Sequence, residues 1–109
     1  MGGEDPPERV FEGIGARFLD DPAVSQGTGF CSNPGLRVDG RIFTMLARGR
    51  LVVKLPRERV DELVASGTAA RFDAGKGRPM KEWAAVPTLH IDQWERLAAE
   101  AFGFVGSAP

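Results

Sequence analysis

The sequence is poor in the side chains from which most catalytic and metal sites are built. Its 109 residues include one cysteine, one histidine and no tyrosine. A single cysteine cannot form an internal disulfide, so nothing in the chain requires an oxidising compartment. Cys31 and His90 lie far apart, and no second cysteine or histidine completes a ligand set. The sequence therefore predicts no metal site of the zinc type.

Long apolar runs and an excess charge of one sign are also missing. No apolar stretch approaches the roughly 20 residues that a membrane helix needs, and residues 1–21 are too acidic for a signal or transit peptide. The net charge is -1, and 42% of the residues are hydrophobic. These properties are typical of a folded domain and argue against disorder. We expect a cytoplasmic protein that does not associate with a membrane.

Turn signals and apolar spacing divide the chain into short elements. Asp39-Gly40 is a favoured two-residue hairpin turn, because both positions tolerate positive φ, and Arg48-Gly49 forms a second tight turn. The strand after it, RLVVKL, alternates only in part, which predicts that both of its faces are partly covered. The first half of the chain is expected to form a helix that begins at Glu8 and is ended by Asp20-Asp21-Pro22, a connector at 23–36 with room for a short strand near Thr28–Cys31, and strands at 36–38, 41–47 and 50–55. The second half is expected to form a helix between Pro56 and Gly67, strands at 69–73 and 81–87, and a helix at 92–102 with Asp92 as its N-cap and Glu95 at the capping-box position.

These elements predict an α+β fold with an antiparallel sheet of about five strands, helices on one face and the order α-β-β-β-α-β-β-α. One domain would cover residues 8–104, between disordered tails at 1–7 and 105–109. The other face of the sheet would stay open for a partner. The apolar strand positions that need a cover, which a homodimer could provide, are Ile42, Phe43, Met45 and Leu46.

Motifs for nucleotide binding are incomplete. The segment ARFDAGKG at 70–77 has Ala70 where a P-loop has its first glycine, and Gly77 where the P-loop has the serine or threonine that binds magnesium. We therefore expect no cofactor. Cys31 is either a reactive thiol or a small, partly buried strand residue, and His90 is either a proton carrier or a surface residue before the last helix. With no catalytic residue indicated, we expect no enzymatic activity.

Charge is distributed unevenly along the chain. Residues 37–59 carry seven basic side chains against Asp39 and Glu58, whereas the segments at 1–21 and 82–109 are net acidic. In one interpretation, the glycine-rich loop 75–81 binds an anion or nucleic acid. Its candidate residues are Lys76, Arg78 and Lys81, with Trp83 beside them as a stacking surface. In the other, the basic residues are the outward side chains of amphipathic strands, neutralised by acidic helices. The pI of about 5.8 is lower than that of a typical nucleic-acid binder.

Three segments of the central region carry a likeness to a known family. They are the strand motif DG-x-x-F-x-x-L at Asp39–Leu46, the strand LVVKL at Leu51–Leu55, and the segment RFDAGKGRPMKEW at Arg71–Trp83. With them, the chain from roughly Thr28 to Gly103 resembles the N-terminal domain of the competence regulator TfoX and its single-domain relatives. The related YjbR-like proteins share this topology. The resemblance implies an α+β domain without known catalytic residues.

Three functional hypotheses follow. The first is a non-enzymatic regulatory or protein-interaction module of the TfoX N-terminal type, which turnover lost on Cys31→Ala or His90→Ala would contradict. The second is the anion- or nucleic-acid-binding domain that uses loop 75–81. The third is a small-ligand pocket between sheet and helix, lined by Phe30, Phe43 and Trp83.

Overall fold

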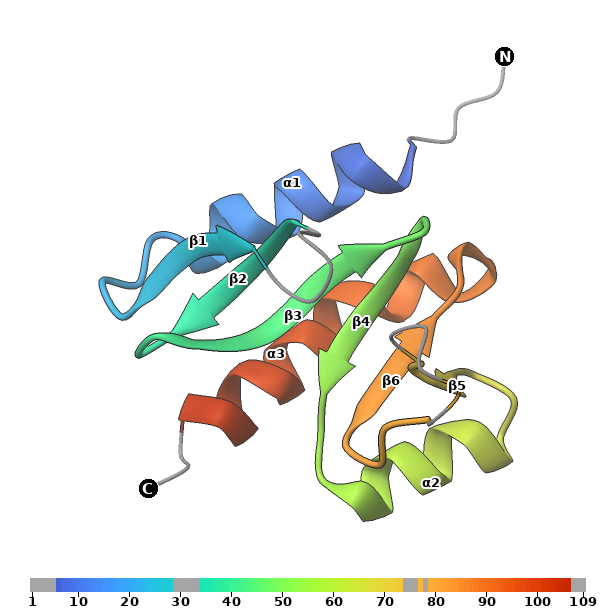
Figure 1. Cartoon of the computed structure of the whole chain (residues 1–109). Coiled ribbons are helices and arrows are strands. Elements are labelled where there is room, and N and C mark those ends of the chain that lie inside the picture. Colours follow the sequence, from blue (N-terminus) through green and yellow to red (C-terminus); the bar gives the residue numbers. More distant parts are fainter. Residues whose placement is uncertain (1–5, 29–33, 74–76, 78, 107–109) are drawn as a thin grey trace.

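The described part of the chain forms a six-stranded antiparallel sheet and three α-helices (Figure 1). The computed structural model describes residues 6–28, 34–73, 77 and 79–106. Its elements are α1 (Pro7–Phe18), β1 (Val24–Thr28), β2 (Pro34–Val38), β3 (Arg41–Ala47), β4 (Arg50–Lys54), α2 (Arg57–Ala65), β5 (Ala70–Arg71), β6 (Trp83–Val86), the 3-10 helix η2 (Thr88–Gln93) and α3 (Trp94–Gly106). The strands follow one another across the sheet in the order β1-β2-β3-β4-β6-β5.

The predicted α+β class and the antiparallel sheet are confirmed. The additional strand is β1, which lies within the predicted connector and pairs with β2 in regular register from Val24↔Val38 to Thr28↔Pro34. Its sequence, VSQGT, contains one apolar residue, so the alternation that reveals strands is nearly absent from it. The short strand that we expected nearby falls partly on residues 29–31, which lie outside the described residues.

Both predicted hairpin turns are confirmed. Asp39 and Gly40 have φ angles of 52° and 81°, and Arg48 and Gly49 have φ angles of 54° and 75°. Two successive positive φ angles produce the turn whose twist matches that of the flanking strands. The meander from β2 to β4 is therefore specified locally, by two dipeptides.

The main core lies between the sheet and the helices. Figure 1 shows α3 crossing behind β3 and β4, and Trp94 and Leu97 of this helix are fully buried. The rings of Phe18, Phe43 and Phe102 contact one another, with centroids 5.4 to 5.6 Å apart. Because these three rings come from α1, β3 and α3, they join two helices to the centre of the sheet. Helix α2 contributes buried Val60 and Leu63 to the same core, so all three helices pack on the predicted single face.

A second, smaller core covers the opposite face of the sheet. It consists of Met45, Ala47, Val52, Phe72, Trp83 and Ala85, with Ile42 and Met80 partly buried at its margin. The backbone N–H of Phe72 donates to the Trp83 carbonyl, and the Met80 N–H donates to the Phe72 carbonyl. These bonds hold the segments after β5 and before β6 against the sheet. The prediction that both faces of β4 are covered is confirmed, because Leu51 and Val53 belong to the main core and Val52 to the second core.

The expectation of an open apolar face is wrong. Phe43 and Met45 are fully buried, and Leu46 is nearly so, within a single chain. The reason that we gave for a homodimer therefore fails, although the homodimer itself stays a prediction.

A β-bulge in β3 decides which side chains face which core. The register passes from Leu36↔Thr44 to Arg37↔Ile42, so Phe43 is an extra residue opposite β2. Phe43 consequently faces the helices, while Ile42 and Met45 face the second core. Trp83 also belongs to the second core, on the side of the sheet away from Phe43. The predicted pocket that combines Phe43 with Trp83 is therefore wrong, and Phe30 lies outside the described residues.

The last helical segment begins earlier and ends later than predicted. Helical turns start at Thr88, directly after Pro87, so Asp92 lies inside η2 and the predicted N-cap is wrong. The Trp94 indole Nε1 donates to the Pro87 carbonyl at 3.3 Å, which ties the start of α3 to the end of β6. Helix α3 continues to Gly106 because Val105, which is 5% exposed, still packs in the main core. Val105 and Gly106 thus extend beyond the predicted limit at residue 104. None of the helices described is both long and apolar enough to cross a membrane.

Candidate functional site

The strands carry positive charge and no negative charge. The six strands contain no aspartate or glutamate, and their basic residues are Arg37, Arg41, Arg50, Lys54 and Arg71. The three α-helices, in contrast, contain seven acidic and five basic residues. The charge asymmetry that the sequence predicts along the chain therefore becomes an asymmetry between the sheet and its helices.

Register places three of the strand cations on the face opposite the helices. Residues paired across antiparallel strands share a face of the sheet. Arg37 pairs with Ile42, Arg50 with Ala47, and Lys54 with Trp83, and each of these partners belongs to the second core or packs against it. We call the surface that carries Arg37, Arg50 and Lys54 the cationic face.

At the centre of the candidate site, Lys54 lies over the ring of Trp83. The Lys54 Nζ is 5.7 Å from the centroid of the ring, and Trp83 is only 6% exposed. A cation–π contact of this kind is worth about 0.5–1 kcal/mol near a surface. It also positions the ammonium group, so a ligand that binds Lys54 meets a charge that is already oriented. With Trp83 nearly buried, little of its ring is left for a nucleic-acid base to stack on.

Two hollows flank the Lys54–Trp83 pair. The larger, of about 560 Å³, is lined by Lys54, Arg57, Met80, Lys81, Glu82 and Trp83. We call it the Lys54 hollow. Arg57 begins α2 and Lys81 precedes β6, and both side chains are exposed. Among the residues that the structure describes, three cations therefore line the opening together with Met80 and Trp83, and Glu82 is the single carboxylate.

The smaller hollow, of about 370 Å³, adjoins the larger one at Lys54. It shares Lys54, Glu82 and Trp83 with the larger one. Its remaining lining combines the start of β3 with the end of α3 and consists of Arg41, Ile42, Phe104 and Val105. The basic lining thus continues past Lys54 toward Arg41.

The structure brings together two of the predicted site residues. Lys81 and Trp83 line the Lys54 hollow, whereas Lys76 and Arg78 lie outside the described residues. Lys54 and Arg57 join them from β4 and α2, and our sequence reasoning did not single out either as a site residue. Both residues belong to the basic segment 37–59, so the uneven distribution of charge along the chain did include them. Lys54 meets Trp83 only because β4 pairs with β6, and no short segment of the sequence specifies that pairing.

Of the two residues with nucleophilic or acid–base chemistry, His90 is described by the structure, and it is not among the described residues that line the Lys54 hollow. His90 lies in η2, partly exposed, and has φ and ψ angles of -114° and 34° that interrupt the helical turns. Cys31 lies outside the described residues. Within the described ranges, no group of three cysteine, histidine or carboxylate side chains is close enough to hold a metal ion.

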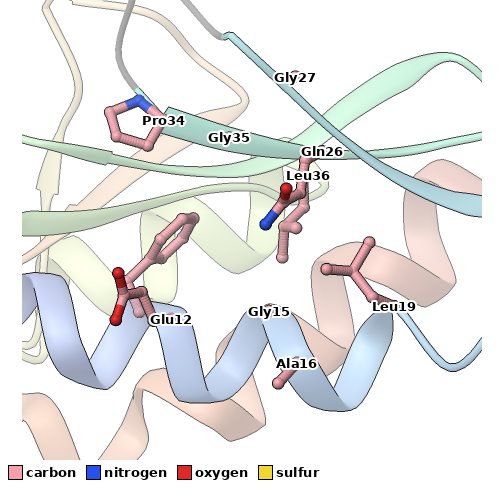
Figure 2. A pocket seen from close by; sticks show the side chains of 10 residues that line it. Glu12, Gly15, Ala16, Leu19, Gln26, Gly27, Pro34, Gly35 and Leu36 are labelled. Atoms are coloured by element: carbon pink, nitrogen blue, oxygen red, sulfur yellow. The ribbon is translucent and has the colours of Figure 1, made fainter.

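A third hollow, of about 390 Å³, separates α1 from β1 and β2 (Figure 2). Leu36 forms part of its floor, and Figure 2 shows the Gln26 side chain extending from β1 toward α1. Glu12 is the charged residue of the lining, and no basic side chain is among the described residues there. This groove therefore lacks the chemistry of the Lys54 hollow.

No protein-family model matches the sequence, and no curated protein matches it either. The likeness to the TfoX N-terminal domain accordingly stays a prediction.

Proposed function

We propose that the protein is a non-enzymatic interaction module of the TfoX N-terminal type, which binds an acidic segment of a partner protein at the Lys54 hollow. The observation that carries the proposal is the convergence of Lys54, Arg57 and Lys81 around one opening, on a sheet whose strands contain no acidic residue. Cations that line a concavity raise the local potential and attract carboxylates.

The composition of the hollow favours a peptide over a polyphosphate chain. Met80 and Trp83 supply apolar contact area beside the three cations, and Glu82 would repel a closely spaced row of phosphates. The net charge of -1 also lacks the excess of positive charge on which non-specific nucleic-acid affinity depends. An acidic peptide with interspersed apolar residues matches both features.

Fluorescence anisotropy with a labelled peptide of alternating glutamate and leucine tests the proposal. The variant Lys54→Gln/Lys81→Gln should weaken binding about tenfold or more, because it removes two of the three cations that the structure describes in the lining of the hollow. A matched control, Arg9→Gln/Arg96→Gln, changes the net charge equally on α1 and α3 and should bind as the parent does.

Labelled duplex and single-stranded DNA serve as competing probes in the same assay. If DNA binds with a steep salt dependence and the peptide does not, the nucleic-acid hypothesis is correct and the proposal is wrong. If neither probe binds at low salt, the Lys54 hollow is ordinary solvated surface and the proposal fails as well.

A further inference from the structure

The two edges of the sheet differ in how they are protected. An exposed strand edge presents unpaired N–H and C=O groups, and stable proteins usually shorten, charge, bend or cover such edges. Strand β5, at one edge, has two residues, and its Arg71 forms an ion pair with Asp61 of α2. Strand β1, at the other edge, has five residues with no charge, no proline and no register shift. By these criteria, β1 is unprotected.

The hydrogen-bond pattern shows which backbone groups of β1 point away from the sheet. The Asp39 N–H donates to the Ala23 carbonyl at 2.9 Å, so these two residues form a hydrogen-bonded pair of the antiparallel ladder. Because such pairs alternate along a ladder, Ser25 and Gly27 also bond to β2. The N–H and C=O groups of Val24, Gln26 and Thr28 therefore face outward.

One of these outward groups is already used within the chain. The Val24 N–H donates to the Asp21 carbonyl at 3.0 Å. The groups available on the edge are then an acceptor at Val24, a donor and an acceptor at Gln26, and a donor and an acceptor at Thr28. When a second copy of β1 runs antiparallel to the first about Gln26, the donors at Gln26 and Thr28 meet the acceptors at Gln26 and Val24, and only the Thr28 carbonyl has no donor opposite it.

We infer that β1 pairs antiparallel with β1 of a second copy of the chain, about a two-fold axis at Gln26. Each Gln26 N–H donates to the carbonyl of the other Gln26, and each Thr28 N–H donates to the carbonyl of the other Val24. Because β1 is uncharged, two identical edges do not repel each other, and no charge on this strand selects a different partner.

Helix α1 covers one face of the sheet near this edge, because Phe18 contacts Phe43 of β3, and Gln26 of β1 and Leu36 of β2 line the groove beneath the helix. The outward N–H and C=O groups of β1 lie in the plane of the sheet, at right angles to the direction in which α1 packs. The Gln26 side chain extends toward α1 (Figure 2), so its backbone and not its amide forms the contact. The two-fold axis is perpendicular to the sheet, which brings the cationic faces of both copies to the same side. Four hydrogen bonds form a small interface, so the dimer is expected to be weak and reversible.

Sedimentation equilibrium over a wide concentration range, with a pair of variants at one position, tests the inference. Gln26→Pro removes the outward N–H but no bond to β2, and edge strands tolerate proline at such positions. We expect it to weaken dimerisation at least about tenfold, since two of the four hydrogen bonds are lost. The matched variant Gln26→Ala also lacks the side chain but keeps the N–H, and it should dimerise as the parent does.

Amide hydrogen exchange of the parent protein gives a second measurement if Gln26→Pro does not fold. The Gln26 amide should exchange more slowly as protein concentration rises, whereas the Ser25 amide, bonded to β2, should not respond. A parent that is monomeric at every concentration overturns the inference. It is equally overturned by a dimer that persists in folded Gln26→Pro, or by a Gln26 amide whose exchange is independent of concentration.

Discussion

At the scale of single residues, Thr44 carries a hydroxyl that is withdrawn from water. Thr44 is fully buried, and its Oγ1 donates to the Val52 carbonyl at 2.9 Å. Buried polar side chains are stable only when they are hydrogen-bonded. This bond joins β3 to β4 immediately after the bulge at Phe43, where the regular ladder to β2 is interrupted.

Thr44→Val should therefore lower the free energy of unfolding by about 1–2 kcal/mol, because it keeps the shape of the side chain and removes a buried hydrogen bond. Urea denaturation followed by circular dichroism measures the change. The control is Thr68→Val, where the hydroxyl shares an exposed contact with Ser66, and the effect should stay within about 0.5 kcal/mol. Equal losses in both variants would show that the Thr44 bond has no special role.

At the scale of elements, α2 and α3 are linked by an ion pair with two parallel hydrogen bonds. The Arg59 Nε donates to Glu100 Oε1 at 2.9 Å, and Arg59 Nη2 donates to Glu100 Oε2 at 3.1 Å. The hydrogen bond to Glu100 is the largest cause that raises the pKa of Arg59 above its usual value. Stability that comes from a raised pKa is lost only as pH rises through the folded value. Arg59 therefore keeps its charge, and its part of the pair, throughout the neutral and moderately alkaline range.

A double-mutant cycle with Arg59→Gln and Glu100→Gln should give a coupling free energy of about 1 kcal/mol, because both side chains are partly buried and the geometry is bidentate. The pair between Arg17 and Glu95, which links α1 to α3, is the comparison. Its side chains are 71% and 50% exposed, so its coupling should be smaller, about 0.5 kcal/mol or less. A larger coupling for the exposed pair would contradict the argument from burial.

The elements also show what could be predicted from sequence. The two hairpin turns, the first helix and the apolar strands were predictable because dipeptides and spacing encode them locally. The strand β1 was not, since its pairing comes from β2 and not from its own five residues. For the same reason Lys81 and Trp83 could be proposed as neighbours, while Lys54, distant in sequence, joins them only through the β4–β6 register.

At the scale of the whole molecule, one sheet separates two cores and each core contains one tryptophan. Trp94 belongs to the main core and Trp83 to the second. Consecutive residues of β4 alternate between the two cores. Unfolding of either core therefore disturbs β4, which packs in the other core as well. The described chain should therefore unfold as a single cooperative unit.

Single-tryptophan variants test this cooperativity. In Trp94→Phe the fluorescence reports the second core, and in Trp83→Phe it reports the main core. Within each variant, the fluorescence and circular dichroism transitions in urea should coincide, since both follow one two-state event. Fluorescence of Trp83 that changes at lower urea than the dichroism would show that the second core opens by itself.

The separation of charge between the sheet and the helices gives the protein an electric dipole although its net charge is only -1. Five basic residues lie on strands without acidic ones, while acidic residues outnumber basic ones on the helices. A charged partner exerts little net attraction on such a molecule but does exert a torque. Within the screening distance of about 8 Å at physiological salt, that torque turns the cationic face toward an anionic surface before any contact forms. The protein can thus be selective in how it approaches a partner while remaining nearly neutral overall.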